Sequence, residues 1–162
     1  IVGQYIGRGD FQRAITRTYM AIKIAAIYMF VLGVIFAAFG PALIRLFFTD
    51  IPDVVSLGHT LLILAAVFQA FDAVNIVTSG ALRGAGDTRW MAIATFLFAY
   101  LFFLPIAIVL AFPAGYGAIG AWIGATIYII GLSGVLFTRF RNGRWQAISI
   151  FSSDPKTSDP LH

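Results

Sequence analysis

Long apolar stretches, divided by short polar or glycine-rich breaks, dominate the chain. Residues 24–44 and 90–138 carry no charged side chain, and residues 54–71 carry only His59. The last apolar stretch is long enough for two helices and is interrupted at residues 112–117, Phe-Pro-Ala-Gly-Tyr-Gly. A helix needs about 20 consecutive apolar residues to cross a hydrocarbon core about 30 Å thick. The pattern therefore predicts four membrane-spanning helices, at about residues 22–47, 55–81, 89–111 and 117–138.

The composition agrees with a membrane protein and not with a soluble domain. Apolar residues make up 60% of the 162 residues and charged residues only 11%, whereas soluble domains carry about 25% charged residues. We therefore expect an all-α polytopic membrane protein in three parts. These are a cytoplasmic turn with a basic amphipathic lead-in (1–21), a four-helix transmembrane bundle (22–138), and a basic interfacial segment followed by a disordered cytoplasmic tail (139–162).

The positive charges follow the predicted spans. They lie before the first span, between the second and third, and after the fourth: Arg8, Arg13, Arg17, Lys23, Arg83, Arg89, Arg139, Arg141 and Arg144. The two alternate loops hold only Arg45. The positive-inside rule then predicts that both ends and the central turn are cytoplasmic. We expect an integral protein of the plasma (inner) membrane. The net charge of +4 reflects this topology, so we expect no nucleic-acid partner.

One carboxylate, Asp72, lies inside the second span. It precedes Arg83, the first cation after the apolar run, by 11 residues. That separation corresponds to about 16 Å along a helix, which is close to the middle of the membrane. An acidic group at this depth costs about 2.5 to 3.5 kcal/mol on insertion scales and by default marks an ion or substrate path.

Other polar residues share the helix face of Asp72. At 100° per residue, Gln69, Asp72, Asn75 and Ser79 fall within an arc of about 120°. This face must point toward protein or water and not toward lipid. We predict that Asp72, Gln69 and Asn75 bind a cation or substrate, with Asp72 also a candidate ligand for Na⁺. The alternative is a packing network in which these groups only join neighbouring helices.

A glycine-rich pattern occurs twice. G-x-x-x-G-x-G-D is found at residues 3–10 and again 77 positions later, at residues 80–87, and each copy precedes a pair of spans. Glycine lets the chain leave a helix through positive φ, and aspartate can cap the next helix. The pattern indicates an internal repeat, although Gly-Asp turns also recur by chance. The second copy predicts a tight turn, pinned by Arg83 and Asp87, made of Gly80, Arg83, Gly84, Gly86 and Asp87.

Prolines, glycines and a tryptophan add local expectations. Pro41 should kink or end the first span, and Pro105 should bend the third, acting either as a hinge or as a shape element. Gly120 and Gly124 form a small-residue pair suited to close helix contact. Trp145 follows the last span and is expected to anchor it at the interface.

The chain resembles the multidrug and toxic compound extrusion (MATE) family of cation-coupled antiporters. Val-Gly-Gln-x-x-Gly-x-Gly-Asp at 2–10 resembles a cytoplasmic turn of that family, and Leu-Phe-Phe-Thr-Asp at 46–50 resembles its outer loop. The most specific part is 68–89, FQAFDAVNIVTSGALRGAGDTR. In one bacterial branch of that family, an aspartate at the position of Asp72 helps bind the coupling cation. Asn75 lies at a position where that branch often has glutamine.

The resemblance implies a twelve-helix transporter with two six-helix lobes. The four spans would be helices nine to twelve, so we expect the chain to be a C-terminal fragment that works with an upstream part of the same protein. It also implies an antiporter, not an enzyme, that exports drugs or other, often cationic, organic compounds in exchange for H⁺ or Na⁺. No cofactor besides the coupling ion is expected, and the remaining partners are membrane lipids.

Three other functions were weighed. A lipid-linked sugar flippase of the same superfamily would be favoured by several cations lining the central cavity, and none lies at mid-membrane. A structural membrane subunit would leave Asp72 unexplained. An intramembrane hydrolase is disfavoured because His59, an expected interfacial residue, lies 13 residues from Asp72, or about 20 Å along the helix.

Overall fold

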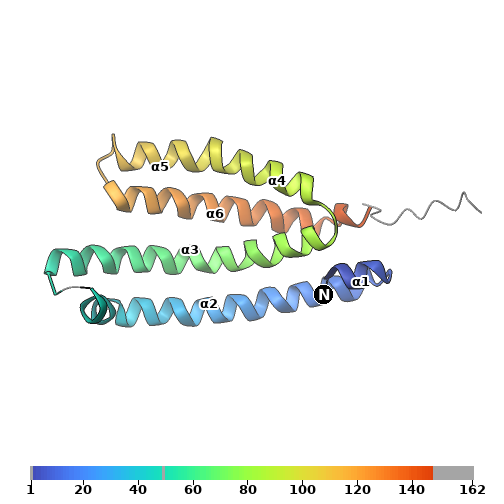
Figure 1. The fold of residues 1–162 in the computed structure, drawn as a ribbon, viewed down its shortest axis with the longest axis horizontal. Helices are drawn as coiled ribbons and strands as arrows, with labels where there is room; N and C mark the ends of the chain where they lie inside the picture. Colours follow the sequence, from blue (N-terminus) through green and yellow to red (C-terminus); the bar gives the residue numbers. More distant parts are fainter. Residues whose placement is uncertain (1, 49, 148–162) are drawn as a thin grey trace, which may run out of the picture.

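The computed structural model describes residues 2–48 and 50–147, which form four long helical rods packed side by side (Figure 1). The predicted basic interfacial segment and disordered tail together comprise residues 139–162. Of these, residues 148–162 lie outside the described residues. Four helical runs are long and apolar enough to cross a membrane, which confirms the predicted all-α architecture with four spans. The elements, in chain order, are α1 (Val2–Gly7), α2 (Phe11–Phe47), α3 (Pro52–Gly84), α4 (Thr88–Leu97), the π-helical η1 (Phe98–Phe103), α5 (Leu104–Ala111), α6 (Gly117–Arg141) and the 3₁₀ turn η2 (Arg144–Ala147).

The first long helix, α2, contains both the basic segment and the first span. Its start is capped by Asp10, whose carboxylate accepts a hydrogen bond of 3.1 Å from the backbone N–H of Arg13. The helix then continues through Lys23 into the apolar stretch. The residues predicted as an amphipathic lead-in are thus the first turns of the same helix, because nothing in this polar segment breaks it.

Pro41 lies inside α2, and the helix continues to Phe47. Its last turns leave the axis of the preceding part, as expected for a proline kink (Figure 1). A proline has no N–H to donate to the carbonyl four residues earlier, here Ala37. His59 on α3 supplies the missing donor, with its Nε2 3.1 Å from the Ala37 carbonyl oxygen. Gly40 makes room for this ring, since a Cβ there would lie 2.6 Å from its Cδ2.

The third span is one continuous rod from Thr88 to Ala111 that changes its helical type midway. In η1 the winding is π-helical, and the N–H of Leu104 donates to the carbonyl of Ala99, five residues earlier. Pro105 follows directly at the start of α5. The wider turn absorbs the hydrogen bond that this proline cannot make. The hinge role predicted for Pro105 stays a prediction.

The two halves of the last hairpin, α5 and α6, touch through glycine. A Cβ at Gly120 would lie 2.5 Å from the carbonyl oxygen of Leu110, and one at Gly124 would lie 2.9 Å from the Cα of Ala107. Backbones approach this closely only where a side chain is missing. The predicted close contact at the G-x-x-x-G pair is therefore confirmed.

The buried core lies at the end of the bundle where the chain begins. Leu82 of α3, Leu132 and Leu136 of α6, and Trp145 of η2 are each no more than 2% exposed. Trp145 stacks on Phe140 with ring centroids 5.4 Å apart and donates its indole N–H to the Phe140 carbonyl at 2.8 Å. The prediction of Trp145 as an interfacial anchor is wrong, because the chain turns back after α6 and folds the ring into this core.

The two glycine patterns adopt the same turn. In each, the aspartate N–H donates to a carbonyl five residues earlier, at 2.9 Å for Asp10 and 3.0 Å for Asp87. The preceding glycine has positive φ, 74° for Gly9 and 83° for Gly86. These are the hydrogen bonds of a Schellman-type helix end, which requires a left-handed residue. The match in sequence is thus also a match in local structure.

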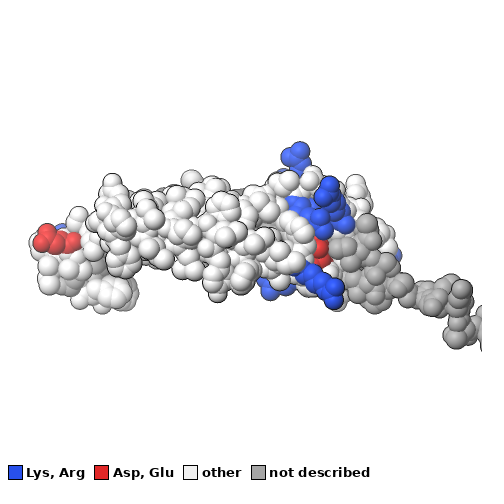
Figure 2. Space-filling model, turned by 90° about the horizontal axis from the view of Figure 1, so that it is seen from above, with Lys and Arg blue, Asp and Glu red and all other residues white. Residues whose placement is uncertain are grey.

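The basic residues gather at one end of the molecule. Figure 2 shows Lys and Arg clustered at the end that carries the α3–α4 turn, whereas the middle of the visible face carries no charged residue. The opposite end carries an exposed acidic patch that includes Asp50 and Asp53. An uncharged middle between charged ends is the arrangement that a membrane-spanning bundle requires.

Candidate functional site

The predicted polar face is present on α3 and begins near the middle of that helix. The amide nitrogen of Asn75 donates to the Asp72 carboxylate at 3.3 Å. One turn further on, the guanidinium of Arg83 donates to the hydroxyl of Ser79 at 3.2 Å. The structure therefore brings the predicted residues Asp72 and Asn75 into direct contact.

The Asp72 carboxylate is half-buried and has no cationic partner among the described residues. The ion pairs found there join Arg13 to Asp10 and Arg139 to Asp87. The phenol of Tyr128, which comes from α6, is close enough to interact electrostatically with Asp72. A carboxylate in a membrane helix without a cationic partner is a candidate site for a cation.

Several buried polar atoms near Asp72 lack hydrogen-bond partners among the described residues. They are Oε1 of Gln69, Oδ1 of Asn75 and the hydroxyl of Thr78. Buried polar atoms in folded proteins are nearly always hydrogen-bonded, since leaving one unpaired costs about 1–3 kcal/mol. The free oxygens of Gln69 and Asn75 can therefore accept a hydrogen bond or coordinate a cation.

A groove of about 520 Å³ adjoins this polar face, between α3, the α4–η1 rod and α6. From α3 it is lined by Asn75, Ser79 and Arg83. From the opposite rod and from α6 it is lined partly by aromatic side chains, including Tyr100 and Tyr128. Aromatic faces attract organic cations, so the groove combines hydrogen-bonding and cation–π groups.

No multidentate metal centre is assembled in this part of the protein. Residues 2–48 and 50–147 contain no group of three His, Asp or Glu side chains placed to hold a metal ion. Among the described residues, the groups available to an ion at Asp72 are one carboxylate and neutral oxygens. Such a weak, hard-oxygen set suits a proton or a monovalent cation better than a tightly held transition metal.

The predicted turn forms, but its contacts differ from those expected. Gly86 supplies the positive φ, whereas Gly80 and Gly84 still belong to α3. Arg83 and Asp87 do not pair with each other among the described residues, and each side chain has another partner. Arg83 bonds Ser79 within its own helix, because the two lie one turn apart on the same face.

Asp87 is 5% exposed and pairs with Arg139 of α6, whose Nε lies 2.8 Å from the carboxylate oxygen. It makes no side-chain cap at the start of α4. This pair could not be predicted from local sequence patterns, because its members are 52 residues apart. It fastens the central turn to the end of the last helix.

Comparison with known proteins now decides the family. The family model described as MatE matches residues 1–112, which is more than half of the chain. The chain belongs to the MatE family. The resemblance inferred from the residues is thereby confirmed.

Curated MatE relatives carry multidrug-resistance names. The chain is 29% identical over 154 residues to "Probable multidrug resistance protein NorM" of Thermotoga maritima, covering 95% of this chain and 33% of that protein. It is 33% identical over 136 residues to the protein of the same name from Agrobacterium fabrum, covering 82% and 29%. It is 33% identical over 149 residues to "Multidrug resistance protein MdtK" of Yersinia pseudotuberculosis, covering 89% and 32%.

The chain thus spans about a third of the length of these MatE relatives. No solved structure gave a significant match.

Proposed function

We propose that this chain is part of a multidrug efflux antiporter of the plasma (inner) membrane, with both ends and the central turn in the cytoplasm. It would export organic, often cationic, compounds in exchange for H⁺ or Na⁺. The observation that carries the proposal is Asp72, a half-buried carboxylate on a predicted membrane span that is hydrogen-bonded to Asn75 and has no cationic partner among the described residues. The names of the MatE relatives support the transport of drugs.

The proposed mechanism is competition for one negative charge. When Asp72 holds a proton or Na⁺, the polar face carries no net attraction for an organic cation. When that ion leaves, the carboxylate and the aromatic groups of the adjoining groove attract the cationic cargo instead. Rocking of two lobes would expose the site to each side of the membrane in turn.

The second lobe and the rest of this one would come from the part of the protein that precedes the chain. The unpaired oxygens of Gln69 and Asn75 support this division, since helices supplied from elsewhere in the protein can provide their partners. The lobe assignment also follows the resemblance, in which the four spans correspond to the last four helices.

The decisive variant is Asp72→Asn in the full-length protein. The amide keeps the size of the carboxylate and one accepting oxygen, but it cannot hold a proton or Na⁺ through charge. We expect uptake of ethidium into inside-out vesicles, driven by a H⁺ or Na⁺ gradient that is high in the lumen, to fall at least about tenfold, corresponding to about 1.4 kcal/mol of lost ion binding. Applying each gradient alone identifies the coupling ion.

Asp53→Asn is the matched control, because Asp53 is an exposed carboxylate in the first turn of α3. It removes the same charge from the same helix, and export should stay at the wild-type rate. Equal amounts of each variant in the membrane must be shown by immunoblotting. Undiminished gradient-driven export by Asp72→Asn would refute the role of this carboxylate.

The alternatives have less support. A flippase for lipid-linked sugars would need several cations along the cavity, and Arg83 is the one cation that lines the groove among the described residues. A purely structural subunit would leave a charge at mid-membrane without a use.

A further inference from the structure

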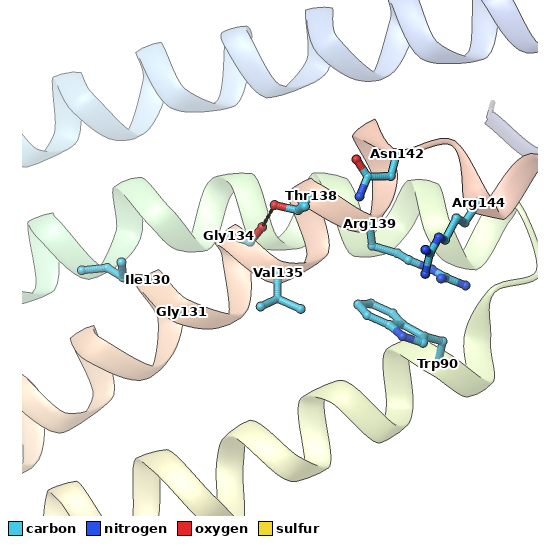
Figure 3. Close-up of a pocket in the computed structure, with 9 residues that line it drawn as sticks. All are labelled: Trp90, Ile130, Gly131, Gly134, Val135, Thr138, Arg139, Asn142 and Arg144. Atoms are coloured by element: carbon cyan, nitrogen blue, oxygen red, sulfur yellow. Dashed lines mark hydrogen bonds between the residues drawn. The ribbon is translucent and has the colours of Figure 1, made fainter.

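A second cavity lies at the basic end of the molecule, between α4 and α6. It measures about 540 Å³, and none of its lining residues contributes to the groove beside Asp72. Figure 3 shows the Trp90 ring as its floor, with the side chains of Arg139 and Arg144 directed into the space above that ring. Its walls therefore combine two cations with an aromatic face.

The polar end of this cavity carries more positive than negative charge. Arg139 donates its Nε–H to Asp87 at 2.8 Å and lies over the Trp90 ring, 4.8 Å from the centroid. Arg144 has no carboxylate partner among the described residues. One of the two guanidinium groups is thus paired with a carboxylate and the other is not, and Asn142 adds an amide to the same lining. Guanidinium groups are suited to bidentate binding of phosphate.

The rest of the cavity is apolar and open along α6. Along α6, from Arg139 toward the middle of the helix, its wall is formed by Ile130, Gly131, Gly134 and Val135. A Cβ added at Gly134 would meet no atom within 4 Å, so this glycine leaves a channel beside the helix. The corresponding face of α4 continues from Trp90 with Ile93, which is 60% exposed. A phosphate-binding end therefore leads into an apolar strip.

We propose that this cavity binds an anionic membrane lipid, with the headgroup phosphate on Arg139 and Arg144 and one acyl chain along Gly134. Arg139 lies in the last turn of α6 and Arg144 begins η2, at the predicted cytoplasmic end of the last span. Figure 2 shows Lys and Arg side chains gathered at one end of the bundle. Basic pockets between membrane helices on the cytoplasmic side bind anionic headgroups. A free phosphate ion would leave the apolar strip without an occupant. The proposal concerns a different site from Asp72 and does not depend on drug transport.

The test is native mass spectrometry of the full-length protein in detergent, titrated with dioleoylphosphatidylglycerol. Arg144→Gln removes one phosphate contact and should weaken binding about fivefold. Gly134→Leu fills the channel and should weaken it about tenfold. Arg141→Gln is the matched control, since Arg141 is an exposed arginine in the same turn that does not line the cavity. It should leave the affinity unchanged.

Further arms separate the lipid from other ligands. Dioleoylphosphatidylcholine, which has the same chains and no net charge, should bind more weakly to the wild type and should not respond to Arg144→Gln. Inorganic phosphate in large excess should not displace phosphatidylglycerol. Melting temperatures of all variants, with Gly134→Ala as a smaller substitution, show whether each protein is folded.

Three results would overturn the proposal. An equal loss of affinity in Arg141→Gln and Arg144→Gln would mean that only surface charge attracts the lipid. Full displacement by inorganic phosphate would mean that the cavity takes a free anion. An unchanged affinity in both Arg144→Gln and Gly134→Leu would mean that another part of the protein occupies this face.

Discussion

The contact of His59 with Ala37 shows how one residue type creates the need for another. Pro41 leaves the Ala37 carbonyl without its helical donor, and His59 provides an N–H from the neighbouring helix at 3.1 Å. The carbonyl can only accept, so the Nε2 atom carries the hydrogen. A histidine close to a membrane surface is thus explained by a proline 18 positions away.

This pairing predicts that the effects of His59 and Pro41 are coupled. His59→Leu should destabilise the protein by about 1–3 kcal/mol, because it leaves the Ala37 carbonyl unpaired in a helix predicted to lie in lipid, where no water can replace the lost donor. In a Pro41→Ala background the same change should have a smaller effect, since the new N–H at position 41 can donate to Ala37. Melting temperatures of the two single variants and the double variant in detergent complete the cycle. Strictly additive shifts would show that the histidine serves another purpose.

Single residues also mark the limit of what the sequence could predict about the site. The helical period placed Gln69, Asp72 and Asn75 on one face, and the structure joins two of them directly. Periodicity gives a face but not the helix that packs against it. Tyr128, whose phenol interacts with Asp72 from α6, was therefore missed.

At the scale of the elements, glycine sets the distance between α5 and α6. A Cβ at Gly124 would lie 2.9 Å from the Cα and 3.0 Å from the N of Ala107, both backbone atoms that cannot rotate away. The sequence predicted this contact because a small-residue pair at this spacing has one physical use in a membrane helix.

Gly124→Leu should therefore force the last hairpin apart. Overpacking of a tight contact costs about 1–3 kcal/mol, so we expect a lower melting temperature and a lower yield of folded protein. Gly134→Ala is the control on the same helix, because a Cβ at Gly134 meets only open space. A fall in melting temperature of the same size in both variants would point to a general intolerance of α6 to side chains.

The helical elements also show why local patterns predicted some turns only in part. The positive φ at Gly86 follows from a glycine that ends a helix. The partner of Asp87 cannot be predicted from such a local pattern. Arg139 lies beside Asp87 only because α4, η1, α5 and α6 fold back along the bundle. Trp145 was misplaced for the same reason, since its burial depends on a reversal of the chain after α6.

Across the whole molecule, the Asp87–Arg139 pair and the core fasten the helices together at the basic end. The Asp87 side chain is 5% exposed and that of Arg139 is 17% exposed, so water screens this pair weakly. Removing one partner of a buried pair leaves an uncompensated charge and costs about 3–5 kcal/mol.

Arg139→Gln and Asp87→Asn should each lower the melting temperature in detergent strongly, and the double variant should be less affected than the sum of the two. Arg13→Gln is the control, because its pair with Asp10 joins exposed residues of one turn. Exposed pairs contribute about 1 kcal/mol or less. A small effect of Asp87→Asn would mean that the apolar core alone holds this end.

The internal repeat has a physical counterpart in the whole molecule, because its two turns touch each other. A Cβ at Gly3 would lie 3.0 Å from the carbonyl oxygen of Gly84, and one at Gly84 would lie 3.2 Å from the N of Gly3. Gly3 is the first glycine of its copy of the pattern and Gly84 is the second glycine of the other copy. A side chain at either position would therefore push the two segments apart. One copy of the pattern alone does not predict this contact.

The π-helical turn of the third span has a further consequence for how this chain can vary. Because successive helical residues are about 100° apart, the single residue that a π turn adds rotates everything after it by that angle. Deleting one residue within Phe98–Phe103 would give a shorter, regular helix with Ala107 swung away from Gly124 and a larger side chain facing that glycine instead. Relatives that lack the extra residue should therefore carry a different pair of small residues between these helices. A sequence alignment that places the one-residue gap outside Phe98–Phe103 would then assign wrong contacts to α5.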